Sequence, residues 1–294
     1  MRYEQIVATL VISLLAGTLG AYLVLPSRDS MAVATHIETA LERVNKTGKL
    51  RCGYIEAPPY FVKDPNTGAY SGLWYELTEK IAELAGVQVV WTAPTSYATV
   101  IPDLKAGKFD AYCSAIWSGA KRAKEAIFSM PLYYSSMNAY ARMDEQRFIG
   151  KLEELNKPAI KFVGIDGSME QSVRQIEFPE SSELSLPQTA DITLMTESVA
   201  TGKADVVISS PALFDPYDKS NPGKLKKIPL ARPLRVFEET YMVLPEDHAL
   251  RDFLNTAGKE LLSSGFVEKT LQKYEVAPGE FLRAKPPYED AAGK

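Results

Sequence analysis

The pattern of hydrophobic and polar positions in the first half of the chain predicts short buried strands that alternate with amphipathic helices. LRCGYI (50–55) has the apolar density of a buried strand, and the prolines of the following APPYF end it because proline removes a donor from the ladder. LWYELTEKIAELAG (73–86) places Leu73, Leu77, Ile81 and Leu84 at helical spacing, with a glycine as the stop. We therefore expect a helix there and a β-branched strand over VQVVWTA (87–93).

A further helix ending at Gly107 and a third strand beginning at Asp110 complete this half, and the same alternation restarts beyond Arg142. In chain order, the second half predicts a strand at 160–165, a loop at DGSM, a helix, a polar stretch, a helix ending at TGK, and strands at 205–209 and 238–245. Residues 250–274 predict two helices broken at Gly265, and the proline-rich residues 277–294 predict a solvated tail.

This alternation predicts an α/β fold in which a parallel sheet carries helices on its faces. LKAGKFDAYCS and VATGKADVVIS share one design, a helix end, a Gly-Lys turn, an aspartate and a strand, so we expect two lobes built alike. Ligands of open α/β sheets bind beyond the carboxyl ends of the strands. The segments to inspect are therefore 56–61, 74, 94–98, 114–122, 166–170 and 209–214. Together they are rich in aromatic residues.

The N-terminus contains an uncharged, mostly apolar run from Ile6 to Leu25, which is long enough to span a bilayer as a helix. AVA at 32–34 resembles a signal-peptidase site but lies beyond two charges. We expect residues 1–34 to be an uncleaved anchor rather than a cleaved signal. Either alternative exports residues 35–294 from the cytoplasm, tethered to the inner membrane by residues 6–25 or soluble in the periplasm.

Composition narrows the classes of partner. The net charge is −4 and the lysines and arginines are scattered, so neither a nucleic acid nor an anionic lipid surface is expected. With two histidines and no CxxC motif, no metal site and no cofactor are expected. Cys52 and Cys113 are predicted to be buried thiols, and a single bridge stays open if their strands are neighbours. No nucleophile elbow or phosphate-binding loop supports hydrolase chemistry.

Several segments together carry a resemblance to a known family: LRCGYIEAPPYF, SGLWYELTEKIAELAG, YATVIPDLKAGKFDAYCSAIWSGAKRAKEAIFSMPLYYSS, VGIDGSMEQ and EETYMVLPEDHALRDFLNTAGKELLSSGFVEKTLQKY. In order over about residues 48–274, they resemble the extracytoplasmic solute-binding proteins of family 3, the polar amino-acid receptors of ABC importers. The Arg-Ala-Lys-x-x-x-Phe-Ser-x-Pro segment is the most specific piece.

The resemblance implies a two-lobed clamp of the type II periplasmic-binding-protein fold, each lobe a mostly parallel sheet flanked by helices. Lobe 1 would comprise residues 45–141 plus 239–276, and lobe 2 residues 142–238, joined by two hinge crossings. A small carboxylate or amino-acid-like solute would lie between the lobes, and closure would report its presence to an ABC transporter permease. The resemblance implies binding without catalysis.

Four positions match residues that contact ligand in the family. Arg122 matches the arginine that grips the ligand's carboxylate, for which a guanidinium fork is suited. Ser168 matches a hydroxyl residue at a helix N-terminus, where free N–H groups favour an anion. Tyr97 matches an aromatic that covers the ligand, and Tyr60 or Phe61 belongs to a loop lining the cleft. Plain core packing is the alternative for each aromatic residue.

The departures from the family pattern are equally informative. Trp117 and Gly119 stand where the family usually has threonine, Trp74 occupies another polar cleft position, and Ser210 replaces the acid that pairs with the α-amino group. Glu56 is our candidate for the missing carboxylate, with Asp166 and Asp215 as rivals. Without such a counter-charge a buried ammonium would be costly.

An enzyme on the same scaffold is the second hypothesis, because some relatives of the family dehydrate cyclohexadienyl carboxylates with a cleft acid. Glu56 or Glu170 would be that acid in this chain.

Overall fold

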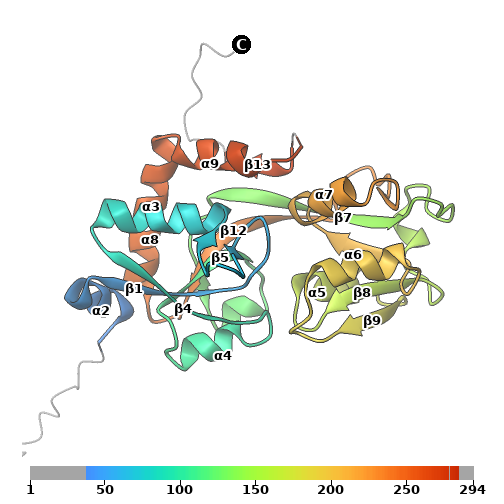
Figure 1. Cartoon of the computed structure of the whole chain (residues 1–294). Helices are drawn as coiled ribbons and strands as arrows, with labels where there is room; N and C mark the ends of the chain where they lie inside the picture. Colours follow the sequence, from blue (N-terminus) through green and yellow to red (C-terminus); the bar gives the residue numbers. More distant parts are fainter. Residues whose placement is uncertain (1–37, 278, 285–294) are drawn as a thin grey trace, which may run out of the picture. The chain divides into compact units, whose positions relative to one another are not determined.

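A computed structural model describes residues 38–277 and 279–284, and the described residues from Thr39 onward form one compact unit (Figure 1). Its first half contains these elements: α2 (Ala40–Thr47), β1 (Lys49–Tyr54), β2 (Val62–Lys63), β3 (Tyr70–Ser71), α3 (Leu73–Ala85), β4 (Gln88–Pro94), α4 (Val100–Lys105), β5 (Ala111–Trp117), η2 (Arg122–Lys124), β6 (Ile127–Phe128) and β7 (Tyr133–Arg142).

The second half contains η3 (Leu152–Glu154), β8 (Lys161–Ile165), α5 (Met169–Glu177), β9 (Ser182–Leu186), α6 (Thr193–Ala200), β10 (Val206–Ser209), α7 (Pro211–Ser220), β11 (Leu225–Lys227), β12 (Arg235–Val243), α8 (His248–Ser263), α9 (Phe266–Tyr274) and β13 (Phe281–Arg283). These elements confirm the strands and helices expected from the hydrophobic pattern. Strand β9 was missed because SELSL lies in a polar stretch without an apolar run.

The fold is mixed α/β, with one main sheet in the order β4-β1-β5-β12-β7-β10-β8-β9 among the described residues. Strands β4, β1 and β5 pair in parallel, as do β10, β8 and β9. Antiparallel strands β12 and β7 join the two parallel groups. The first half of β7 pairs with β12 and its second half pairs with β10, so this strand belongs to both groups.

Amphipathic helices cover the two parallel groups because their apolar stripes fit against the sheet. In the first group α3 buries Leu73, Leu77 and Ile81 in one core with residues of α8 and α9. Leu84, which shares their helical spacing, is 45% exposed because it lies in the last turn, where the helix ends at Gly86. In the second group, α5 and α6 each contribute to a core of their own around β8 and β10.

Cys52 of β1 and Cys113 of β5 form a disulfide, so the prediction of two buried thiols is wrong and the open alternative of a single bridge holds. The physical reason is the strand order, since β1 and β5 are neighbours and place the two Cα atoms 5.5 Å apart. Such bonds persist in oxidising compartments.

Two predictions concern the ends of the chain. Part of the segment expected as a solvated tail is ordered, because Phe281–Arg283 pairs with β7 as β13 and the Phe281 ring is buried. The apolar run at 6–25 lies outside the described residues. Within the described part of the chain, none of the helices combines the length and hydropathy needed to cross a bilayer.

Candidate ligand-binding cavity

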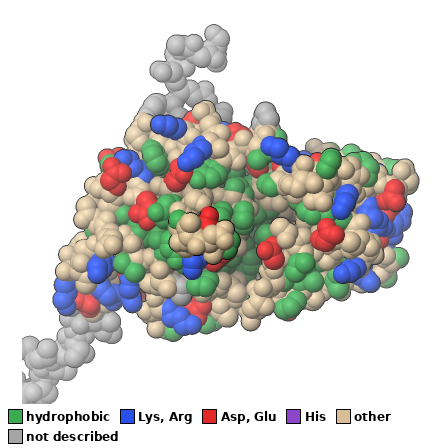
Figure 2. All heavy atoms as spheres, viewed as in Figure 1, with side chains coloured by type: hydrophobic (Ala, Val, Ile, Leu, Met, Phe, Trp, Pro, Cys, Tyr) green, Lys and Arg blue, Asp and Glu red, His purple; other side chains and the backbone are tan. Residues whose placement is uncertain are grey.

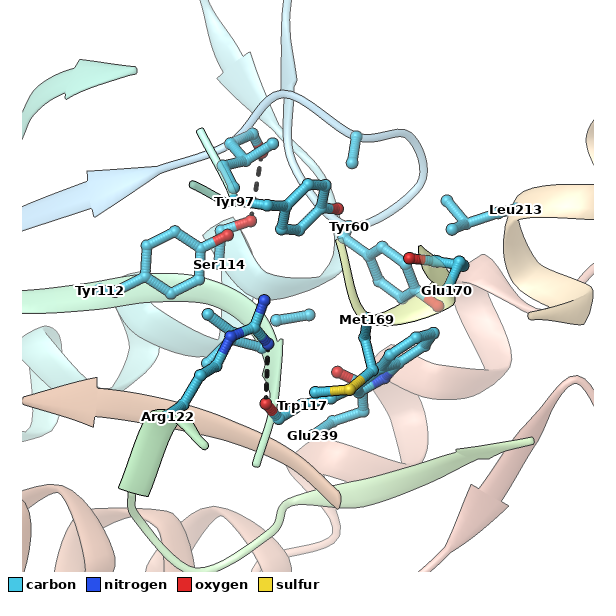
Figure 3. A pocket seen from close by; sticks show the side chains of 14 residues that line it. Tyr60, Tyr97, Tyr112, Ser114, Trp117, Arg122, Met169, Glu170, Leu213 and Glu239 are labelled. Carbon is cyan, nitrogen blue, oxygen red and sulfur yellow. Dashed lines mark hydrogen bonds between the residues drawn. The ribbon is translucent and has the colours of Figure 1, made fainter. Parts of the chain in front are cut away.

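A cavity with about 460 Å³ of empty space, part of it open to solvent, lies at the carboxyl ends of the parallel strands. Its walls come from the loops after β1 and β4, from β5, η2 and β12, and from the first turns of α5 and α7 (Figure 3). Figure 2 shows hydrophobic side chains gathered near the middle of the visible face, whereas lysines and arginines are scattered over it. The location is the one at which open α/β sheets bind ligands.

Arg122 projects into this cavity. Strand β5 ends at Trp117, and the chain turns so that Arg122 opens η2 and its Nη1 donates to the Trp117 carbonyl oxygen at 3.0 Å. Figure 3 shows the guanidinium pointing toward Tyr97 and Tyr112. Burial lowers the pKa of Arg122 from its ordinary value, an effect opposed by Tyr97 and Glu170. Among the described residues no carboxylate forms a salt bridge with this guanidinium, so it is a partly buried cation whose charge is attracted by Glu170 but is not paired directly.

Aromatic side chains enclose the guanidinium. Tyr97 and Tyr112 line the cavity, and burial raises the pKa of both phenols. Tyr60 lines it from the loop after β1, and its hydroxyl lies 3.2 Å from the Ser210 Oγ. Neutral phenols and their ring faces give this wall an apolar character with a few polar points, which is typical of small-molecule sites.

Trp117 also lines the cavity, and two contacts fix its indole. Its ring stacks on Phe237 with centroids 4.8 Å apart, and its Nε1 donates to Glu239 Oε1 at 2.7 Å. The position where the family usually has threonine is therefore filled by a rigid aromatic wall whose donor is already used.

Glu239 of β12 lines the cavity and was not predicted from the sequence. Its side chain is almost fully buried, at 1% exposure, and Oε1 also accepts a hydrogen bond from the Ser135 hydroxyl. Oε2 is buried without a hydrogen-bond partner among the described residues. Burial raises the pKa of Glu239 to about 7. The available signal was an acidic residue inside EETYMVLP, a segment whose pattern otherwise predicts a buried strand.

Glu170, in the first turn of α5, is the second buried acid of the cavity. Burial raises its pKa, and hydrogen bonds from its own backbone N–H and from Ser168 oppose the rise. Ser168 itself is the N-cap of α5: its hydroxyl accepts a hydrogen bond from the Gln171 N–H at 3.2 Å. Ser168 does not line the cavity but caps the helix whose first turn does.

The remaining predicted residues lie elsewhere, and the expectation that Trp74 faces ligand needs correction. Trp74 is 0% exposed, packs edge-on against Tyr241 and donates from Nε1 to the Tyr133 hydroxyl at 2.8 Å, so it is a core residue. Exposed Glu56 lines a neighbouring hollow with Ser96 and Gln188, which has about 330 Å³ of empty space, part of it open to solvent. Ser210 is buried behind Tyr60.

Three further predicted residues are also outside this cavity. Asp166 and Asp215, the rivals for the missing carboxylate, do not line it, and neither does Phe61, which is buried against Tyr54 and Trp91. In residues 38–277 and 279–284 no group of His, Cys, Asp and Glu side chains has the arrangement of a metal site.

Comparison with known proteins gives a consistent picture. Cyclohexadienyl dehydratase from Pseudomonas aeruginosa is 22% identical over 218 residues, which cover 74% of this chain and 79% of that protein. A probable histidine-binding protein from Campylobacter jejuni is 21% identical over 215 residues, covering 70% and 77%. The crystal structure of an ancestral amino acid-binding protein, a precursor of cyclohexadienyl dehydratase, superposes with a TM-score of 0.70 at 23% identity, covering 80% and 99%.

The solved structure shares the fold of this chain. The model of the bacterial extracellular solute-binding proteins, family 3, matches residues 50–277, which is most of the chain and includes every residue that lines the cavity. The protein belongs to family 3 of the bacterial extracellular solute-binding proteins.

Proposed function

We propose that the protein captures a small carboxylate or amino-acid-like solute in the cavity and delivers it to an ABC importer. Arg122 carries this proposal, because a partly buried guanidinium without a salt bridge favours an anion and presents a fork that fits a carboxylate bidentately. Tyr97, Tyr60 and Trp117 would cover the rest of the solute with their rings. The histidine-binding and amino-acid-binding relatives support this class of ligand.

We also propose that capture involves closure of two lobes, residues 45–141 plus 239–276 and residues 142–238. The cavity has walls from both, and β7 and β12 are the connections between them. Side-chain hydrogen bonds between the lobes include Tyr60 to Ser210, Ser96 to Gln188 and Ser118 to Glu238, at 3.2, 3.1 and 3.2 Å. Hinge strands that continue from one lobe into the other allow such closure with small changes at few residues.

Arg122→Ala tests the role of the guanidinium. The full-length protein would be screened by thermal unfolding with the twenty L-amino acids and with small carboxylates. A ligand present at 100 times its Kd should stabilise the wild type by about 2.7 kcal/mol, and the variant should lose that stabilisation because the carboxylate loses its partner. Lys124→Ala is the matched control, since Lys124 lies in the same η2 turn but is exposed and does not line the cavity. An unchanged dissociation constant in Arg122→Ala would refute the assigned role.

A cyclohexadienyl-dehydratase-like enzyme is the second candidate, favoured by one observation. Glu170, one of the two predicted acids, lines the cavity with a raised pKa, as a general acid requires, whereas Glu56 does not line it. The 22% identical dehydratase relative is consistent with this idea. Incubation of the protein with prephenate or arogenate, followed by chromatography, decides the matter: absence of an aromatic product eliminates the enzyme.

The protein would work in the periplasm, as expected of an extracellular solute-binding family. We propose tethering to the inner membrane by residues 6–25, on the basis of their uncharged apolar sequence. N-terminal sequencing of the mature protein tests this, because a start near residue 35 in a soluble fraction would show cleavage instead.

A further inference from the structure

Glu239 is a buried acid whose free oxygen has no role in the fold. Its Oε1 accepts hydrogen bonds from Trp117 and Ser135, which fix the carboxyl group at the cavity wall. Its Oε2 is fully buried and lacks a partner in the described part of the chain. No lysine or arginine of that part forms a salt bridge with it. Buried polar atoms are nearly always paired, so an unpaired carboxyl oxygen beside a ligand cavity points to a ligand that donates to it.

Resting on the function proposed above, we infer that Glu239 is the counter-charge for a protonated amino group, so that the solute carries both a carboxylate and an ammonium. Arg122 from η2 and Glu239 from β12 line the same cavity without forming a salt bridge to each other. An amino acid supplies the missing partner of each. Ser210, the position at which the family would place an acid, is instead engaged with the Tyr60 hydroxyl.

The energetic argument favours an ammonium over a neutral ligand group. A charged Glu239 with one free oxygen is costly in this apolar wall, and a protonated Glu239 would leave its own hydroxyl without an acceptor. An ammonium bound at Oε2 removes both problems, because it pairs the charge and satisfies the oxygen. Glu170 is the less suitable partner for the ammonium, because its carboxylate is attracted by the neighbouring Arg122.

Glu239→Gln tests this inference with the full-length protein, because glutamine keeps the shape and the acceptor for Trp117 but removes the charge. The probes are L-amino acids paired with their des-amino acids, such as L-phenylalanine with phenylpropionate, L-histidine with imidazolepropionate and L-arginine with guanidinovalerate. In the wild type the best amino acid should bind at least about tenfold more tightly than its partner. In Glu239→Gln that amino acid should weaken roughly 30-fold or more, and the des-amino acid should not weaken.

The control is Glu280→Gln. Glu280 is also a buried glutamate with an unpaired oxygen, Oε1, but it does not line the cavity. Glu280→Gln should leave the affinity for the amino acid and the affinity for its des-amino acid unchanged. Equal affinity of the wild type for both members of each pair, or an equal loss for both in Glu239→Gln, would overturn the inference. If Arg122→Ala weakens binding while Glu239→Gln does not, the proposed function survives and the inference fails. If the wild type binds neither the amino acids nor the des-amino acids, the proposed function and the inference both fail.

Proton release is an independent readout. With a pKa near 7, Glu239 is mostly protonated at pH 6, so binding of an ammonium should expel close to one proton. Calorimetry in two buffers of different ionisation enthalpy measures this number.

The titratable groups that share the cavity or lie close to this carboxyl are Arg122, Glu170, Tyr60, Tyr97, Tyr112 and Tyr133. The tyrosines have raised pKa values and stay neutral. Release should therefore vanish in Glu239→Gln and persist in Glu170→Gln. Its persistence in Glu239→Gln would contradict the assignment.

Discussion

At the scale of single residues, the cavity combines a cation and an acid, neither of which forms a salt bridge with the described residues. Arg122 has a lowered pKa and Glu239 a raised one, both because burial disfavours the charged form. Such groups reduce the stability of the ligand-free protein, and under the proposed function a bound solute would pair with them. Perturbed ionisable groups in a cavity are typical of functional sites for this reason.

The raised pKa of Glu239 predicts how stability depends on pH. The native state favours the protonated acid, with a pKa of about 7 against an ordinary 4.5. Its contribution is therefore fully present below the unfolded pKa and is lost as the pH rises through the native pKa. Relative to Glu239→Gln, the wild type should lose roughly 2–3 kcal/mol of unfolding free energy between pH 5 and pH 8. Denaturant unfolding of both proteins at the two pH values measures the difference, and parallel pH profiles would contradict it.

At the scale of elements, an aspartate makes the same pair of hydrogen bonds between neighbouring strands in each of the two parallel groups. Asp110 donates its backbone N–H to the Arg51 carbonyl and accepts from the Arg51 N–H, and Asp205 makes the same pair of bonds with Lys161. These are the aspartates of the two Gly-Lys segments that look alike in the sequence. Each aligns a strand at the end remote from the cavity, and each also pairs with arginine, Asp205 with Arg147 and Asp110 with Arg51.

Replacing these aspartates should lower stability without changing binding. The Asp110 side chain is 0% exposed whereas that of Asp205 is 19% exposed, so Asp110→Asn removes the better-desolvated charge. We expect a loss of about 2 kcal/mol for Asp110→Asn and about 1 kcal/mol for Asp205→Asn, both reduced by solvent around the half-exposed arginines. Chemical denaturation gives the stabilities. A change in ligand Kd in either variant would show that the alignment extends to the site.

At the scale of the whole compact unit, the close approach between the proposed lobes depends on a glycine. Gly167 has a φ of +81°, and a Cβ there would lie 2.9 Å from the Ala98 Cβ and 3.0 Å from its Cα. Gly167 precedes α5 in one proposed lobe, and Ala98 follows Tyr97 in the other. A methyl group at this place would meet backbone and could not be accommodated without separating the two segments.

Gly167→Ala should therefore weaken ligand binding about tenfold by opposing closure, in addition to costing about 1 kcal/mol of stability through its left-handed backbone. Gly202→Ala is the matched control, because Gly202 has a φ of +76° but only a distant Arg142 Nη1 at 3.8 Å. The control should lose similar stability and keep its affinity. Equal affinities in the two variants, measured by calorimetry with the best ligand of the screen, would argue against closure at this contact.

Local patterning predicted much of the fold, because helical spacing and β-branched runs are properties of neighbouring residues. The helix over Leu73–Ala85 and the break at Gly265 are examples. Features that depend on distant pairing were missed. Strand β13 is apparent only once Phe281 lies against β7, and the bridge between Cys52 and Cys113 only once β1 and β5 are neighbours.

The sequence by itself determined the α/β alternation, the family resemblance and the position of Arg122 in a specific motif, because each rests on residues close together in the chain. Only the tertiary structure decided which side chains share the cavity. It moved Trp74 into the core and brought Glu239 of β12 beside Trp117, across 122 residues of sequence. Burial and the absence of a partner for Oε2 among the described residues give Glu239 its chemistry, and both arise from packing between distant segments.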